Sequence, residues 1–274
     1  MSRGAREGEA PPLPEALSVA LADSHCHLDI MGGDVPAQLA LAASVGIDTV
    51  VQIGVDVDSS RLSAELAASH DNVWAAVALH PNEAGRGGAS AEALDQIALL
   101  ARLPEVVAIG ETGLDHFRTE PSGQGMQEEA FRRHLQIAKD VGKAVVIHDR
   151  DAHDDVLRVL REEGPPDVVV FHCYSGDAAM ARVCADAGYY LSFAGPVTFK
   201  PNDALREAAA VCPADRLLVE TDAPFLTPMP FRGRPNAPYL IPHTMRALAA
   251  ARAADLDELC GQVAENGRRA FGYS

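Results

Sequence analysis

The chain has 274 residues, of which 47% are hydrophobic and 23% are charged, a composition typical of globular proteins that excludes disordered and fibrous classes. Its 23 Lys and Arg against 39 Asp and Glu give a formal net charge of −16, which argues against a broad basic surface for long nucleic acids or anionic membranes. No uncharged run approaches the roughly 18 residues of a membrane span, and the N-terminal segment lacks an apolar leader. We therefore expect a cytoplasmic protein without membrane contacts.

The N-terminal segment and the cysteines are two further features of the sequence. Residues 1–15 are small, charged and rich in proline, which predicts a flexible N-terminal tail before one domain at 16–274. The five cysteines show no CxxC spacing, so neither a disulfide framework nor a cysteine zinc site is indicated.

Short apolar, β-branched runs alternate with longer amphipathic stretches along the chain, and this order predicts parallel strands covered by helices. About eight strands are expected, at Leu21–Ser24, Thr49–Ile53, Val73–Ala78, Val106–Ile109, Ala144–Ile147, Val168–Phe171, Tyr189–Ser192 and Leu217–Glu220. This α/β pattern favours a single (β/α)8 TIM barrel over two domains. A doubly wound open sheet is the alternative, although the chain has no GxGxxG after the first strand and no GxxxxGK[ST].

Helix signals lie between the strands. Ser59 and Ser60 precede one apolar-periodic stretch, and Ser90 precedes another. The clearest helix runs from about Gly125 to Val141, where apolar residues recur at helical spacing and Gly142 ends it.

Residues that can bind metal follow five of the expected strands, at the end where parallel barrels place their active sites. They are His25 and His27 after the first strand, Glu111 after the fourth, His148 after the fifth, His172 after the sixth and Asp222 after the eighth. Because side chains alternate along a strand, His25 and His27 share one face. Mixed imidazole and carboxylate ligands suit zinc, manganese, iron, cobalt or nickel. Six donors exceed the needs of one catalytic zinc and predict two ions about 3.5–4 Å apart, bridged by a carboxylate.

The other histidines receive different expectations. His80 follows the third strand at the same rim, where a substrate contact and a structural hydrogen bond are equally compatible with its position. The remaining helix and loop histidines are expected to be solvated or to cap helices: His70, His134, His153 and His243.

Five stretches at these strand ends form a recognisable set. They are His25–Asp29, Gly110–Asp115, Val146–His148, Phe171–Gly176, and Glu220–Pro224 followed by Phe231–Arg234. Together they resemble the TatD-type metal-dependent deoxyribonucleases of the amidohydrolase superfamily. The resemblance extends from about Leu21 to Gly272 and is most specific between Leu218 and Asn236.

The resemblance implies a barrel with a centre of two divalent ions, such as magnesium, manganese or zinc. It assigns His25, His27 and Asp222 to one ion, His148 and His172 to the other, and Glu111 to a bridge between them. It also assigns a phosphate contact to His80. The chain departs from the family at Tyr174, Asp149 and Asn82, where the family often has other residues.

The six candidate ligands favour metal-dependent hydrolysis of phosphodiester bonds. Asp222 is the expected general base and Glu111 its catalytic partner. Lys200, Arg232 and Arg234 are the candidates for substrate contact, although solvated loop positions are equally compatible with Arg232 and Arg234. The resemblance implies an exonuclease acting on single-stranded DNA ends and is compatible with digestion from the 3′ end, although the sequence leaves the polarity open. The alternatives are a hydrolase of small esters or amides, including aminoacyl esters on tRNA, and a metal-dependent binding protein. The sequence leaves the oligomeric state open, and a monomer is compatible with it.

Overall fold

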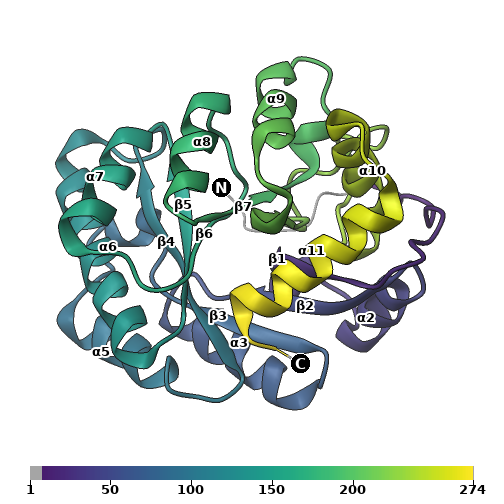
Figure 1. The fold of residues 1–274 in the computed structure, drawn as a ribbon. Coiled ribbons are helices and arrows are strands. Elements are labelled where there is room, and N and C mark those ends of the chain that lie inside the picture. The colour runs from purple at the N-terminus through teal and green to yellow at the C-terminus, as the bar shows by residue number, and fades with distance from the viewer. Residues whose placement is uncertain (1–7, 274) are drawn as a thin grey trace. The chain divides into compact units, whose positions relative to one another are not determined.

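The computed structural model describes residues 8–273 and confirms the (β/α)8 TIM barrel (Figure 1). One sheet orders its strands from β1 to β8 in chain sequence, whereas a doubly wound sheet would permute them. The chain divides into two compact units, which are described separately: unit 1 holds residues 8–51 and 176–269, and unit 2 holds residues 52–175 and 270–273. Of the helices in the described residues, none is long and apolar enough to cross a bilayer.

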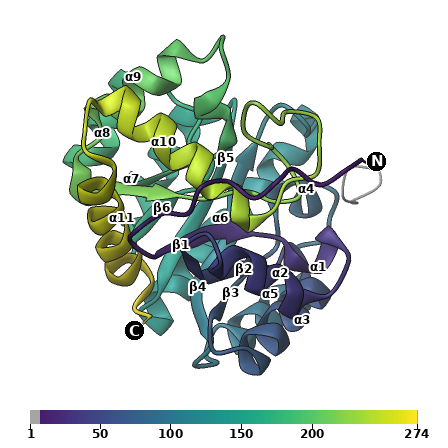
Figure 2. The same cartoon turned by 90° about the vertical axis from the view of Figure 1, so that its right-hand side faces the viewer.

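Unit 1 carries both the first and the last strands of the sheet. In chain order its elements are β1 (Leu21–Cys26), α1 (Leu28–Met31), α2 (Val35–Ala43), most of β2 (Ile47–Ile53), α8 (Ala178–Asp186), β7 (Tyr190–Phe193), η1 (Gly195–Thr198), α9 (Asp203–Val211), η2 (Ala214–Arg216), β8 (Leu217–Val219), η3 (Pro238–Leu240), α10 (Ile241–Arg252) and most of α11 (Leu256–Phe271). Helices α8, α9 and α10 pack in succession (Figures 1 and 2). Cys26 pairs with Ala223 in a parallel bridge, so the chain next to β8 meets the end of β1.

Unit 2 contains the middle of the sheet and its covering helices. Its elements are α3 (Val57–Ser69), β3 (Val73–Val77), α4 (Pro81–Ala84), α5 (Ala91–Leu100), β4 (Val106–Asp115), α6 (Pro121–Val141), β5 (Ala144–Arg150), α7 (His153–Glu163) and β6 (Val169–Phe171). Strands β4 and β6 are buried along their whole length, as parallel strands covered on both faces must be.

The N-terminal segment makes contacts within unit 1. Residues 1–7 of the predicted tail lie outside the described residues. In the part that follows, the Pro11 carbonyl accepts a hydrogen bond from the Tyr239 hydroxyl at 2.8 Å, and the Glu15 carbonyl accepts one from Arg246 at 2.9 Å. The flexible tail and the single domain both stay predictions.

Helix boundaries follow local hydrogen bonding. Ser90 caps α5 as predicted, by accepting a hydrogen bond from the Ala93 amide, and Gly142 ends α6 in the left-handed conformation at φ 65°. Helix α3 starts earlier than the serine signal indicated. Asp56 is its N-cap and forms a capping box with Ser59, because the aspartate carboxylate accepts the third helical amide.

Strand β4 is longer than predicted and extends past Ile109 to Asp115. The added residues pair with β5, so that Gly113 lies opposite His148 and Asp115 opposite Arg150. Gly113 makes this pairing possible, because it adopts φ +130° and a Cβ there would lie 2.2 Å from the His148 carbonyl oxygen. Tertiary pairing therefore overrides the low strand propensity of this glycine-containing stretch.

We expect Gly113→Ala to lower the free energy of unfolding by about 3 kcal/mol or more, because alanine is both strained at this φ and blocked by a backbone oxygen. Urea unfolding of the metal-free protein measures this loss. Gly125→Ala is the matched control: Gly125 lies inside α6 with nothing within 4 Å of its added Cβ. That variant should gain about 0.5–1 kcal/mol through helix propensity. Equal stability of the two variants would contradict the role given to Gly113.

Candidate metal centre

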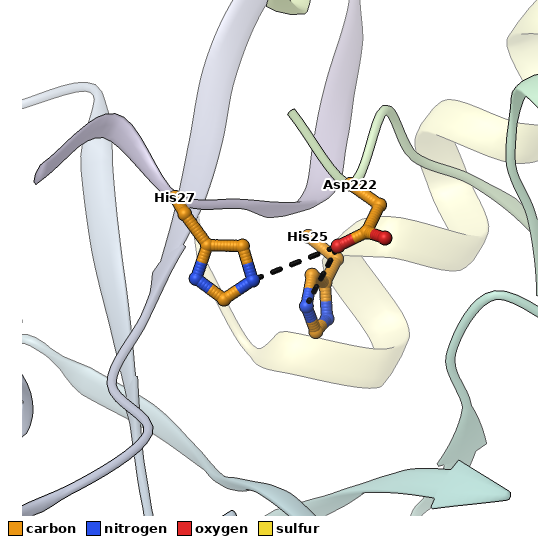
Figure 3. Close-up of side chains that lie close together, drawn as sticks. All are labelled: His25, His27 and Asp222. Carbon is orange, nitrogen blue, oxygen red and sulfur yellow. Dashed lines mark ion pairs between the residues drawn. The ribbon is translucent and has the colours of Figure 1, made fainter. Parts of the chain in front are cut away.

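In unit 1, two imidazoles and one carboxylate converge at the junction of β1 and the chain after β8 (Figure 3). The Nε2 atoms of His25 and His27 lie 3.7 and 3.6 Å from Oδ1 of Asp222. These separations are longer than hydrogen bonds, and they are close to the roughly 3.4 Å between two ligands of a tetrahedral ion with bonds near 2.1 Å. We refer to these three residues as the unit 1 cluster.

Backbone hydrogen bonds between the two segments hold the unit 1 cluster in place. The Asp222 amide donates to the His25 carbonyl at 2.9 Å, and the His27 amide donates to the Ala223 carbonyl at 2.8 Å. Asp222 adopts φ 54°, a left-handed conformation that aspartate tolerates better than most residues. The chain therefore turns sharply where it presents the carboxylate to the histidines.

A second carboxylate, Asp23, lies beneath this cluster in the core. It is fully buried and accepts hydrogen bonds from the Thr221 hydroxyl, from the Thr221 amide at 2.9 Å and from the His25 amide at 3.2 Å. Burial raises the pKa of Asp23 to about 7, although these hydrogen bonds favour its ionised form. Asp23 thus ties β1 to the segment that carries Asp222, a role that the sequence analysis missed.

In unit 2, one carboxylate oxygen faces three imidazoles. Oε1 of Glu111 lies 2.6 Å from Nδ1 of His148, 2.8 Å from Nε2 of His172 and 3.3 Å from Nε2 of His80. Burial opposes ionisation of Glu111, but the adjacent imidazoles outweigh it and hold the pKa of this carboxyl well below its usual range. We refer to these four residues as the unit 2 cluster.

Asp115 orients His148 from the other side of the ring. Its Oδ2 lies 3.2 Å from Nε2 of His148, and its Oδ1 accepts the Arg118 amide at 2.7 Å. Burial opposes its charge, but these hydrogen bonds lower the pKa of Asp115 to about 2. A carboxylate that accepts a hydrogen bond from one ring nitrogen commonly orients a metal-binding histidine. Because Asp115 contacts Nε2 of His148, the nitrogen left to bind a metal ion is Nδ1. The position of Asp115 at the end of β4 is the sequence signal that could have identified this residue.

Both clusters have the donor chemistry of a divalent transition-metal site. Imidazole nitrogens and carboxylate oxygens gather within 4.8 Å of one another in each unit: His25, His27 and Asp222 in unit 1, and His80, Glu111 and His148 in unit 2. The structure therefore brings together, within its own unit, each of the six residues that the sequence singled out as ligands. Their assignment to particular ions stays a prediction.

His80 lies within the unit 2 cluster, although the sequence left it between a substrate contact and a structural role. Its Nδ1 accepts a hydrogen bond from the Asn82 amide at 3.0 Å, so a neutral ring carries its proton on Nε2, which faces Glu111. Burial lowers the pKa of His80 and favours this neutral form.

The three predicted substrate-binding cations lie in unit 1 with different surroundings. Lys200 is exposed just after η1, and the exposed Arg232 places its guanidinium 4.5 Å from the centre of the Phe199 ring. Arg234 binds the N-terminal segment, because it donates hydrogen bonds to the carbonyls of Glu9 and Ala10 at 2.9 Å. Its guanidinium is engaged with the N-terminal segment.

The expectation of a surface or capping role for His134 is wrong. Its side chain on α6 is fully buried, its Nε2 accepts the Leu79 amide at 3.3 Å, and its Nδ1 lies 2.8 Å from the Thr112 hydroxyl. Burial lowers the pKa of His134 to about 3, so the ring is neutral and donates through Nδ1. His134 thereby holds the residues that precede His80 and follow Glu111.

Comparison with known proteins places the chain beside metal-dependent hydrolases. The sequence profile of the family described as TatD related DNase matches residues 22–272. A Mycobacterium tuberculosis protein named uncharacterized metal-dependent hydrolase TatD is 44% identical over 92% of this chain and 98% of its own length. A protein of Erwinia amylovora named 3′-5′ ssDNA/RNA exonuclease TatD is 36% identical over 84% of this chain and 91% of its own. The crystal structure of YjjV, a TatD homologue from Escherichia coli K12, superposes with a TM-score of 0.87 at 29% identity, covering 93% of this chain and 98% of that one.

We expect His134→Gln to lower the free energy of unfolding by about 1–3 kcal/mol at pH 7.5, because the Leu79 amide or the Thr112 hydroxyl loses its buried hydrogen bond. The loss should shrink as the pH falls. His134 has a pKa of about 3 when folded and about 6.5 when unfolded, so its contribution is complete above pH 6.5. It then declines by up to about 1.4 kcal/mol per pH unit towards pH 3.

Urea unfolding of the metal-free protein at several pH values measures this effect. The control is Ile137→Ala, which shortens another buried side chain of α6 without a titrating group. Its cost should be independent of pH. A His134→Gln difference that also stays constant between pH 7.5 and pH 4.5 would contradict the buried, neutral ring.

Proposed function

The chain belongs to the family of TatD-related DNases and is a metal-dependent hydrolase by family, and we propose that it hydrolyses phosphodiester bonds at single-stranded nucleic-acid ends. The observation that carries the proposal is the pair of ligand clusters at strand ends, because such sites activate water against poorly electrophilic anionic esters. Two relatives, from Erwinia amylovora and Salmonella typhimurium, are named 3′-5′ ssDNA/RNA exonucleases, and we extend this direction of digestion to the chain.

We propose that each cluster holds one divalent ion. His25, His27 and Asp222 are the ligands in unit 1, and Glu111, His148 and His172 are the ligands in unit 2. Bound ions would supply Lewis acidity and lower the pKa of water towards neutrality. Asp115 keeps His148 in the required tautomer, whichever metal is native. The bridging role of Glu111 stays a prediction that rests on the family resemblance.

Asp222 is the residue best placed to take the proton from the attacking water. Its side chain is 15% exposed, whereas the His25 side chain is fully buried and that of His27 is 7% exposed. Solvent therefore reaches the carboxylate more readily than either imidazole. In unit 2, the neutral His80 presents an Nε2 proton that can donate to a phosphate oxygen.

The function is tested with a panel of substrates incubated with magnesium, manganese or zinc after removal of bound metal by a chelator. A labelled single-stranded oligonucleotide should be shortened from its 3′ end, and turnover should require added metal. A blunt duplex of the same sequence should react slowly, because its terminal bond must leave the helix before cleavage. Hydrolysis of p-nitrophenyl acetate or an aminoacyl-tRNA without nuclease activity would overturn the proposal.

Asp222→Asn should lower kcat by about 10²–10³-fold, because the amide neither accepts the proton nor binds the ion as strongly. The assay follows oligonucleotide shortening at saturating metal, with metal content measured on the same sample. Asp58→Asn is the control, since it makes the same chemical change at a side chain that is 95% exposed on α3. Near-normal turnover of Asp222→Asn would remove Asp222 as the base.

A further inference from the structure

Within residues 8–273, no carboxylate forms an ion pair with the guanidinium of Arg150, the last residue of β5. Its guanidinium carbon lies 4.1 Å from the centre of the Phe117 ring. The charge remains available to an anionic ligand.

The acids near Arg150 in the fold or in sequence bind other groups. Asp115, opposite Arg150 in the sheet, faces His148, and Asp149 lies 2.7 Å from Nδ1 of His153. Asp155 pairs with Arg158 at 3.0 Å. Asp151, the following residue, is exposed to solvent and makes no ion pair within residues 8–273. These carboxylates do not neutralise the guanidinium.

Arg150 lies close to the unit 2 cluster along the strand. It follows His148 by two residues, so the alternation of a strand directs both side chains to the same face. Its carbonyl accepts the His116 amide at 2.9 Å, which fixes the start of the loop that carries Phe117. The pair is therefore anchored to the strands that present Glu111 and His148.

Phe117 is the second residue of the pair. The residue is 62% exposed, which is a high value for a large aromatic residue on the loop that follows the strand carrying Glu111. Stacking on this ring fixes the plane of the guanidinium and leaves its N–H edges free to form paired hydrogen bonds with a phosphate. The ring surface not covered by Arg150 can stack on a nucleobase.

We propose that Arg150 and Phe117 form a nucleotide subsite, in which Arg150 binds a phosphate next to the one attacked and Phe117 stacks on a base. The proposal rests on the proposed nuclease function and adds the part of the substrate beyond the scissile phosphate. The three cations predicted from the sequence did not include this arginine, because it follows the ligand motif and carries no signal of its own.

The test compares Arg150→Gln, Arg150→Lys and Phe117→Ala on two substrates: a single-stranded pentanucleotide, and bis(p-nitrophenyl) phosphate, which has neither a second phosphate nor a base. Arg150→Gln should raise KM for the pentanucleotide by about 10-fold with little change in kcat. Phe117→Ala should raise it by about fivefold. Arg150→Lys should lie between wild type and Arg150→Gln, since lysine keeps the charge without the planar fork. Hydrolysis of the small diester should not change in any variant.

Arg216→Gln is the matched control. Arg216 also stacks on an aromatic ring, that of Tyr190 at 5.2 Å, but it lies before β8 and pairs with Asp215. This substitution removes the same charge and the same kind of contact, and KM for the pentanucleotide should be unaffected. A KM increase equal to that of Arg150→Gln would overturn the subsite, because it would reflect net charge alone.

Inhibition separates failure of the subsite from failure of the function. Thymidine 5′-phosphate should inhibit hydrolysis of the small diester by the wild type more strongly than thymidine does, and Arg150→Gln should lose this difference. If the wild type cleaves the pentanucleotide but Arg150→Gln keeps the same KM and inhibition, the subsite is wrong and the function stands. If the wild type cleaves only the small diester, the function is wrong, and the inhibition constants still decide the subsite.

Discussion

The buried carboxylate of Glu111 is the constraint on which unit 2 depends. A charge with 4% of its residue surface exposed is tolerable only with partners, and three imidazole nitrogens lie within 3.3 Å of one of its oxygens. The imidazoles come from the ends of three other segments, so those ends must be held in fixed register with β4. The pairing of Gly113 with His148 is the local means of doing so, because only a residue without a side chain fits against that carbonyl.

Helix α6 supplies the next layer of support through uncharged polar groups. Gln127 and His134 lie seven residues apart and therefore on one face of the helix. Gln127 donates to the Pro81 carbonyl at 3.1 Å and accepts the Asp115 amide at 3.1 Å, while His134 binds the Leu79 amide and the Thr112 hydroxyl. Both residues are fully buried, and each joins the segment after β3 to β4. A neutral histidine and an amide satisfy these backbone groups without placing a further charge beside Glu111.

The sequence was sufficient for the strand order and for the placement of the candidate ligands at strand ends, because buried parallel strands have a clear apolar pattern and polar residues interrupt it abruptly at their ends. The extension of β4 was not predictable in this way, since it depends on partners in β5 rather than on local propensity. His134 had a usable signal. It lies three residues after Phe131 and four before Ala138, on the buried face of α6, but the arginines at 132 and 133 suggested a solvated position. Hydrogen-bond partners such as Asp23 and Thr221 are 198 residues apart, and no local pattern reveals them.

The net charge of −16 gives the few available cations their importance. Arg132 and Arg158 are held by the carboxylates of Glu128 and Glu162, and Arg234 is held by the backbone of the N-terminal segment. These arginines therefore contribute little to the binding of a polyanion. An aromatic ring holds Arg150 without neutralising it, so one positive charge lies near the unit 2 cluster. Affinity for a strand rises with the number of phosphates that are neutralised, and each uncompensated arginine reaches only one or two of them. Under the proposed nuclease function, this charge placement would favour short contacts near a strand end over a long duplex, without any reading of base sequence.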